Sequence, residues 1–305
     1  MKFLELLLLF LLFASLVIGL YLLWINLPTD SLEFVEYKAN ISQEFPQQSS
    51  QFYPNMRYSN KEISYKMQER CGAKKQNDVE TALSIIEQKT VLEFYKSDEP
   101  EITILCSSIV PKAEDKDHYI AGEGGPTEII NSSKYAIIIK GEISLYRSET
   151  CDTPQISTHE ILHALGFNHN SNEKSIMYPI TDCEQTIDQE IINTINDIYS
   201  EQSYGDIAID SVIANKTGRY LNFNMVMVNE GLKKIENSTL KLIIDNEIIA
   251  TYTVAELDLG TKRFLSVKNQ RIPRGVNEIK FVIETSQQEL SKDNNEVIIK
   301  ALQSD

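Results

Sequence analysis

The sequence predicts a membrane-spanning helix at the amino terminus, then a mixed α/β domain, then an all-β sandwich. Three observations lead to this prediction: an uncharged apolar run, a stretch in which strand and helix patterns alternate, and a final stretch with strand patterns alone. The expected boundaries are 1–27 for the helix, 28–60 for a stalk or pro-segment, 61–203 for the α/β domain and 206–303 for the sandwich. A length of 305 residues suits two domains with additional segments.

Residues 6–27 carry no charge and are long enough to cross a bilayer, which takes about 20 helical residues. A cleaved signal peptide is the alternative, but its apolar core is typically about 7–15 residues long and ends at a small-residue site. This run is longer, and Tyr21 and Trp24 near its end suit a membrane interface. We therefore expect a retained single-pass anchor with the amino terminus in the cytoplasm and the body outside. Cleavage would instead release a secreted form.

The segment 28–60 lacks helical or strand periodicity and contains prolines and the run Gln-Gln-Ser-Ser-Gln. Such a composition is typical of a linker, so we expect a stalk that lifts the body off the membrane. A pro-segment is the second interpretation.

The α/β domain is predicted from hydrophobic periodicity. The helix expected at 78–95 has Val79, Leu83 and Ile86 at helical spacing. A final helix would begin with a capping box formed by Thr186 and Gln189. The expected elements are strands at 62–68, 101–106 and 135–140, the last extended by 142–147, and helices at 78–95, around the metal motif and at 188–199.

The central motif is His159-Glu160-Ile161-Leu162-His163-Ala164-Leu165-Gly166-Phe167-Asn168-His169. On a helix, His159 and His163 leave the same face one turn apart, which suits two ligands of one metal ion. Gly166 can end the helix, because glycine adopts a left-handed turn at little cost, and His169 can then return as a third ligand. Three histidines and one open position are typical of a catalytic Zn²⁺ site. Glu160 would be the general base for a zinc-activated water.

The residues before the motif favour a helix start there. Asp152-Thr153-Pro154 offers a capping oxygen followed by proline at the first helical position. An amphipathic helix whose histidines align by chance is the alternative interpretation.

A second motif, Ser175-Ile176-Met177-Tyr178-Pro179, follows the first. The pair resembles the signature of the metzincin metalloproteases, and the form of the second motif resembles the matrixin branch. The resemblance implies a metzincin-like catalytic domain with a mixed twisted sheet and a zinc helix. It also implies that Met177 forms an apolar floor under the metal and that Tyr178, Pro179 and Ile180 line the substrate pocket.

The resemblance also suggests that residues 119–125 form the sheet edge on which a peptide substrate lies as an added strand. The glycines at 122, 124 and 125 could equally form a loop. The family's calcium sites and a second zinc site are not evident, and we expect His118 to be a surface residue.

Four cysteines, Cys71, Cys106, Cys151 and Cys183, lie in the α/β domain and form no C-x-x-C pair. Disulfides are expected outside the cell. The ends of neighbouring parallel strands would bring Cys71 to Cys106, so Cys151 would pair with Cys183 around the zinc motif. As an alternative, Glu69-Arg70-Cys71-Gly72 resembles the core of the matrixin cysteine switch, although its flanking prolines are missing.

Residues 206–303 show strand patterns separated by turn residues, as expected for an immunoglobulin-like β-sandwich. An Asn-x-Gly turn and a late Asp-Asn-Asn-Glu resemble CARDB-type modules. We expect this domain to be a spacer or a binding arm with an unknown partner, and we see no chemical constellation in it. The seven predicted strands are 207–213, 221–228, 240–244, 248–254, 263–267, 278–285 and 296–301, and four Asn-x-Ser/Thr sequons begin at Asn40, Asn131, Asn215 and Asn237.

The net charge of −15 argues against a nucleic-acid partner, which needs a basic surface. The sequence thus predicts a membrane-tethered zinc endopeptidase acting on peptide or protein substrates. An extracellular adhesion or binding protein with a catalytically silent metzincin domain is the alternative. A hydrolase of a non-peptide substrate is a third hypothesis.

Overall fold

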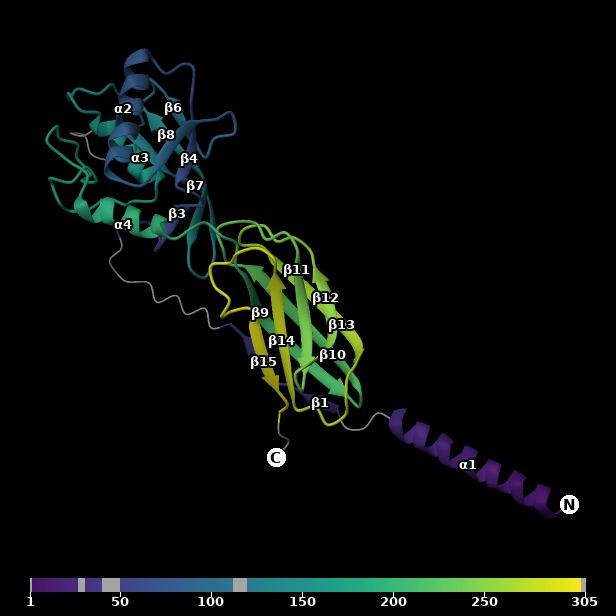
Figure 1. Cartoon of the computed structure of the whole chain (residues 1–305). Coiled ribbons are helices and arrows are strands. Elements are labelled where there is room, and N and C mark those ends of the chain that lie inside the picture. Colours follow the sequence, from purple (N-terminus) through teal and green to yellow (C-terminus); the bar gives the residue numbers. More distant parts are fainter. Residues whose placement is uncertain (1, 27–30, 40–49, 112–119, 303–305) are drawn as a thin grey trace.

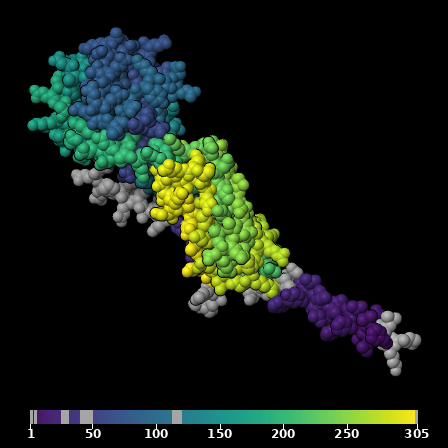
Figure 2. All heavy atoms as spheres, in the orientation of Figure 1, coloured from purple at the N-terminus to yellow at the C-terminus, as the bar shows by residue number. Residues whose placement is uncertain are grey.

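The computed structural model describes residues 2–26, 31–39, 50–111 and 120–302. Two globular domains and one helix follow one another along an elongated molecule (Figure 1). The space-filling view shows the domains as two adjoining bodies, with the helix extending beyond the sandwich (Figure 2). His118, Tyr119 and Asn40 fall outside the described residues.

The amino-terminal helix α1 (Lys2–Asn26) contains an apolar stretch from Leu6 to Trp24, none of which is buried inside the structure. Its length and composition allow it to cross a membrane, and a signal sequence has the same properties. At its end, the Arg274 guanidinium of the sandwich donates a hydrogen bond to the Trp24 carbonyl at 2.6 Å and lies 4.9 Å from the centre of the indole ring.

The α/β domain is built on a mixed six-stranded sheet in the order β3-β8-β6-β4-β5, with β7 antiparallel on the other side of β8. All the other pairings are parallel. Strand β7 therefore forms one edge of the sheet along the full length of β8. The strands are β3 (Met56–Tyr58), β4 (Glu62–Met67), β5 (Glu93–Lys96), β6 (Ile102–Cys106), β7 (Gly122–Asn131) and β8 (Ala136–Leu145).

Three helices complete this domain: α2 (Ala73–Lys89), α3 (Gln155–Ala164) and α4 (Gln189–Ser200). Helix α3 packs against α2 on one side and against β7 and β8 on another. One apolar core joins the sheet to the helices and includes Ile86, Ile104 and Leu162, each with an exposed fraction of zero. The expected α/β architecture, with strand 135–140 extended past Gly141, is confirmed.

The helix expected at 78–95 is wrong at both ends. Helix α2 begins at Ala73 and ends at Lys89, and residues 93–96 form strand β5 beside β4. Thr90 already has extended backbone angles, and the following Val-Leu-Glu-Phe-Tyr is rich in residues that favour strands. Pairing with β4 therefore prevails over the helical spacing of the apolar residues.

Both expected helix caps are also wrong. Pro154 is the N-cap of α3 rather than its first residue, and the Glu149 carboxylate, not Asp152, accepts a first-turn N–H, that of Ile156 at 2.8 Å. Helix α4 begins after Asp188, which makes no capping hydrogen bond. The carboxylate of Asp188 instead accepts hydrogen bonds from the side chains of Asn170 and Asn172 near the third histidine, at 3.3 and 3.0 Å.

The described part of segment 28–60 is not a free stalk. Strands β1 (Ser31–Glu33) and β2 (Tyr37–Lys38) pair with β9 of the sandwich, and Phe34 is buried in the sandwich core. Met56–Tyr58 form β3 of the catalytic sheet. These strands are two or three residues long, too short for periodicity to reveal them in the sequence.

The carboxy-terminal domain is a sandwich of two antiparallel sheets. The seven expected strands are confirmed, and β1 and β2 add to one sheet. That sheet contains β9 (Ile207–Thr217), β10 (Tyr220–Asn229) and β13 (Lys262–Arg271), and the other contains β11 (Ser238–Ile244), β12 (Glu247–Val254), β14 (Glu278–Thr285) and β15 (Glu296–Lys300).

Two disulfides cross-link the α/β domain. Cys71 is bonded to Cys106 and Cys151 to Cys183, which is the pairing inferred from the sequence. Because Cys71 is in a disulfide, it has no free thiol for a cysteine switch in this structure. The second bridge joins the two ends of the segment that contains α3 and the Ser175–Pro179 motif, which we call the Met-turn.

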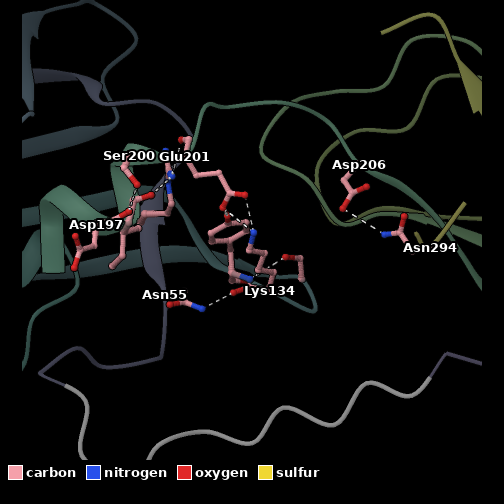
Figure 3. A network of polar contacts seen from close by, with 11 residues as sticks. Asn55, Lys134, Asp197, Ser200, Glu201, Asp206 and Asn294 are labelled. Carbon is pink, nitrogen blue, oxygen red and sulfur yellow. Dashed lines mark hydrogen bonds and ion pairs between the residues drawn. The ribbon is translucent and has the colours of Figure 1, made fainter. Parts of the chain in front are cut away.

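The two domains meet at the turn between β7 and β8. Tyr135 and Ile137 are buried together with Leu232 of the sandwich, and the Ser133 backbone N–H donates to the Glu230 carboxylate. On the catalytic side of the junction, Lys134 forms an ion pair with Glu201 at 2.7 Å, and Asn55 donates to the Lys134 carbonyl at 3.0 Å (Figure 3). The β7–β8 hairpin thus connects the sandwich to the region of the metal motif.

Candidate metal centre

Three histidine rings converge beside the middle of the catalytic domain. His159 and His163 leave helix α3 one turn apart, and His169 returns from the loop that follows. The Nε2 atom of His169 lies 3.1 Å from that of His159 and 3.1 Å from that of His163. A ligand atom from each of the three residues lies within 4.8 Å of the others, so together they could hold one metal ion.

The other ring nitrogen of each helical histidine contacts a backbone carbonyl. His159 Nδ1 lies 2.5 Å from the Ile176 oxygen, and His163 Nδ1 lies 2.7 Å from the Phe167 oxygen. Because a carbonyl oxygen only accepts hydrogen bonds, Nδ1 carries the proton and Nε2 keeps its lone pair. Such contacts fix the tautomer and the orientation of a metal-binding imidazole.

Burial keeps these rings neutral. It lowers the pKa of His159 to about 4, with a smaller contribution in the same direction from His169. Burial also lowers the pKa of His163 to about 4, aided by His159, and lowers the pKa of His169. Neutral imidazole is the form that binds a metal, so a donor set of three such nitrogens, two of them oriented by backbone carbonyls, fits Zn²⁺.

Gly166 makes the turn that brings His169 back. Its φ of +96° lies in the region that favours glycine, and a Cβ there would lie 2.6 Å from the Met56 side chain. The expected end of the zinc helix at this glycine is confirmed, since α3 ends at Ala164 and Leu165 is its C-cap.

Residues 50–52 support the loop between the second and third histidines. The Phe52 N–H donates to the Gly166 carbonyl, and the Asn168 N–H donates to the Ser50 carbonyl, both at 2.8 Å. The Phe52 ring stacks on His163, with centroids 5.8 Å apart and planes at 23°. Sequence reasoning missed this support, because these residues lie in the segment interpreted as a stalk and carry no motif.

The Met-turn lies directly beneath this loop. Met177 is fully buried, and its carbonyl accepts the Asn170 N–H at 3.0 Å. Ser175 is also fully buried, and its hydroxyl donates to Asp188 and accepts the Met177 N–H at 3.0 Å. Sequence analysis assigned Asp188 only to the start of a helix, so its role in holding the turn was not foreseen.

The three residues expected in a substrate pocket come directly after Met177 and lead toward the surface of the domain. Tyr178 is half-buried, Pro179 is exposed and the side chain of Ile180 has an exposed fraction of 50%. They are near the surface and therefore available for contact. No described contact links them to a ligand, and their pocket role stays a prediction.

Glu160 is buried against the edge strand. Its exposed fraction is 6%, and Gly122 and Gly124 of β7 lie directly against it. A Cβ on Gly124 would be 2.2 Å from the Glu160 carbonyl oxygen, and one on Gly122 would be 2.7 Å from its Cγ. Burial, with a smaller effect from Glu123, raises the pKa of Glu160 to about 8. A carboxyl group with such a pKa is suited to accept and return a proton near neutral pH.

These features together define a metzincin-like zinc metalloprotease domain. The sheet is mixed and has an antiparallel edge, one helix presents two histidines and a glutamate, and a third histidine follows a glycine turn. The Matrixin family model matches residues 57–200, which lie within this domain. The match covers the elements from β3 to α4. A comparison with curated proteins gives no match.

Two solved structures are similar to parts of the chain. High choriolytic enzyme 1, a hatching enzyme zinc-protease from Oryzias latipes (medaka fish), is 19% identical over 44% of this chain and 55% of its own, with a TM-score of 0.26. The CARDB domain of a Pyrococcus furiosus protein, solved in complex with di-metal ions, is 12% identical over 33% of this chain and 94% of its own, with a TM-score of 0.26. The assignment of the catalytic domain rests on the family match and on its geometry.

Proposed function

We propose that this protein is a membrane-tethered zinc endopeptidase that hydrolyses peptide bonds in a protein substrate outside the cell. The observation that supports this best is the convergence of three imidazoles, two of them oriented by backbone carbonyls, next to a buried glutamate. A structural zinc site would fill all four positions with protein ligands, whereas His159, His163 and His169 leave one open.

In this proposal the three Nε2 atoms hold the zinc ion, which when bound supplies Lewis-acid polarisation and lowers the pKa of water. Glu160 accepts the proton of the attacking water and later delivers it to the leaving amine. Its burial against β7 excludes bulk water from this proton transfer. Met177 supports the loop that carries His169 from below.

The edge strand β7 would bind the substrate backbone as an added antiparallel strand. One side of β7 pairs with β8, and its first residues run along Glu160. Tyr178, Pro179 and Ile180 would contact the side chains of the substrate on the opposite wall.

The decisive experiment compares the full-length wild type with Glu160→Gln, both in detergent micelles. Metal content and cleavage of a mixed peptide library are measured for each. We expect one zinc per chain in both proteins and cleavage by the wild type alone. Glu190→Gln, an exposed glutamate on α4, is the matched control and should cleave like the wild type.

Two results would reject the proposal. Equal cleavage by Glu160→Gln would remove the glutamate from the mechanism. Bound zinc with no cleavage by the wild type of any peptide in the library would favour the binding protein with a silent metzincin domain.

Membrane tethering needs its own measurement, because α1 also fits a signal sequence. We expect the protein to remain in the membrane fraction after alkaline carbonate extraction, with its first residues intact by mass spectrometry. A mature chain that begins after residue 27 and is found in the medium would replace the anchor with a cleaved leader.

A further inference from the structure

A group of oxygen-bearing side chains lies where the chain enters the sandwich. Asp206 directly precedes β9, and Glu289, Asn294 and Asn295 belong to the connection between β14 and β15. Gly205 forms a bridge with Glu289, which brings the two segments together although they are more than 80 residues apart in sequence. The side chains of Asp206 and Asn294 point toward each other (Figure 3).

Hydrogen bonds close these residues into a ring. Asn294 Nδ2 donates to Asp206 Oδ2 at 3.3 Å, and Asn295 Nδ2 donates to Glu289 Oε2 at 2.9 Å. The other oxygen of Glu289 accepts the Ile207 N–H at 3.0 Å. Ile207 follows Asp206 in the chain, so this bond closes the ring. The amide and backbone donors around the ring are therefore already in use.

Three oxygens of this ring are buried and accept no hydrogen bond within the described part of the chain: Asp206 Oδ1, Asn294 Oδ1 and Asn295 Oδ1. The exposed fraction is 6% for Asp206 and 7% for Asn295. A buried acceptor without a partner costs about 1–3 kcal/mol, more when charged, so three together need an explanation.

The charges make the cost higher. Burial, with smaller contributions from Glu289 and Glu230, raises the pKa of Asp206 to about 6, although the Asn294 amide and the Ser291 backbone act in the opposite direction. Burial also raises the pKa of Glu289. Among the described residues, no lysine or arginine forms an ion pair with either carboxylate, although Lys292 acts to lower the pKa of Glu289. A hard cation would compensate both negative charges.

We propose that Asp206, Asn294 and Asn295 bind one divalent cation of the calcium type, and that Glu289, whose oxygens accept from Ile207 and Asn295, orients Asn295 and adds a second negative charge. The available donors are carboxylate and amide oxygens, which Ca²⁺ prefers, and no imidazole or thiolate belongs to the ring. A bound Ca²⁺ would use the three unpartnered oxygens and complete its shell with water. This site is independent of the histidine centre and of the proposed peptidase activity.

The site would stabilise the junction between the two domains. The Asp206 carbonyl accepts the Glu230 N–H at 2.7 Å, and the Glu230 carboxylate accepts the Ser133 N–H of the β7–β8 turn. An ion bound to Asp206 would therefore hold Asp206 in place. Through Glu230, it would also hold the β7–β8 turn of the other domain against the sandwich.

The test uses the full chain in detergent, with buffers freed of calcium by a chelating resin and zinc restored to one equivalent. Equilibrium dialysis against ⁴⁵Ca²⁺ measures uptake by the wild type, Asp206→Asn and Glu289→Gln. We expect the wild type to bind one Ca²⁺ more than either variant, with a Kd of about 10⁻⁴–10⁻³ M, as in extracellular modules. Asp258→Asn, an exposed aspartate of the same domain, should bind like the wild type.

A thermal unfolding scan adds a readout that a purely structural carboxylate would not give. Without calcium, Asp206→Asn should be as stable as the wild type or more so, because it removes a buried charge. With 5 mM Ca²⁺, at least about five times that Kd, the midpoint should rise for the wild type and stay constant for the variant. Equal uptake by wild type and both variants, or no calcium-dependent rise in the wild type, would overturn the proposal.

Discussion

The Phe52 ring lies on the ring of His163, with 5.8 Å between the centroids and 23° between the planes. This contact joins a proposed metal ligand to the segment that enters the catalytic domain. The Phe52 N–H also holds the Gly166 carbonyl, and Gln51 forms a bridge with Phe167. The loop between the second and third histidines is thus held by residues more than 100 positions earlier in the chain.

We expect Phe52→Ala to weaken zinc binding, because His163 loses the packing that fixes its ring. Outer contacts of metal ligands are worth about 10–100-fold in affinity, and we expect a loss of about tenfold here. Competition with a fluorescent zinc chelator measures it. Tyr53→Ala is the matched control, since the Tyr53 side chain has an exposed fraction of 51% and no ring contact with a histidine. Equal affinities for the two variants would contradict the prediction.

The same contacts limit where a pro-segment could end. Cleavage after residue 60 would remove Phe52 and the strand β3, whose Met56 and Tyr58 are buried in the core. We expect a chain that begins at 61 to be less stable to heat than one that begins at 50 and to lose zinc more readily. Equal unfolding midpoints would show that residues 50–60 are dispensable.

Gly124 allows the edge strand to lie against Glu160, the proposed general base. In Gly124→Ala the new methyl group would be 2.2 Å from the Glu160 carbonyl oxygen, so β7 or α3 must move. We expect cleavage of the library peptides to fall at least about tenfold while zinc stays bound, because displacements of this size near reacting groups can cost about 100-fold.

Gly125→Ala is the matched neighbour. A Cβ at Gly125 meets nothing within 4 Å, so this variant should cleave like the wild type. If Gly124→Ala also retained full activity, the close approach of β7 would not be needed for catalysis.

The stability of the metal-free protein should depend on pH through Glu160. Its pKa is about 8 in the folded chain against an ordinary value of 4.5, because burial disfavours the charged form. Between pH 4.5 and 8 the unfolded chain releases this proton and the folded chain keeps it. Raising the pH through this window therefore lowers the free energy of unfolding, and Glu160→Gln should lack that loss.

The histidines act in the opposite direction, since their folded pKa values of about 4 lie below the ordinary 6.5. The contribution of the histidines to the free energy of unfolding is complete above pH 6.5 and is lost as the pH falls to 4. Both proteins share it, so the difference between them isolates Glu160. Urea unfolding measures the free energy of unfolding of both proteins at pH 5 and pH 8. From pH 5 to pH 8, the value for Glu160→Gln should rise relative to the wild type by a few kcal/mol. Parallel pH curves would contradict the assigned pKa.

The sequence predicted those features whose information is local. The spacing of His159, His163 and His169 around Gly166 predicted the three rings that converge in the structure, and strand patterns of five or more residues located the sandwich. Short elements such as β3 were missed, because their stability comes from pairing with β8 rather than from their own residues. The stacking of Phe52 on His163 and the meeting of Asp206 with Asn294 depend on tertiary contacts between distant segments, which no local pattern records.

The two disulfides provide a comparison of stability with metal binding. They close loops of similar length, with sequence separations of 35 for Cys71–Cys106 and 32 for Cys151–Cys183. In the loop-entropy model each contributes about 3–4 kcal/mol, so both double Cys→Ser variants should lose similar stability to urea. The loop closed by Cys151–Cys183 contains all three histidines and Met177, whereas the other bridge joins β6 to the turn before α2.

Zinc affinity should therefore distinguish the two variants. With Cys151 and Cys183 changed to serine, the ends of the metal-binding segment are released, and Gln155, which donates to the Cys183 carbonyl at 2.8 Å, loses a fixed partner at the start of α3. We expect weaker zinc binding in this variant and unchanged binding in the Cys71/Cys106 variant, measured by chelator competition under conditions in which both are folded. Equal affinities would mean that helix α3 and the Met-turn hold the centre without the bridge, through contacts such as that of His159 with the Ile176 carbonyl.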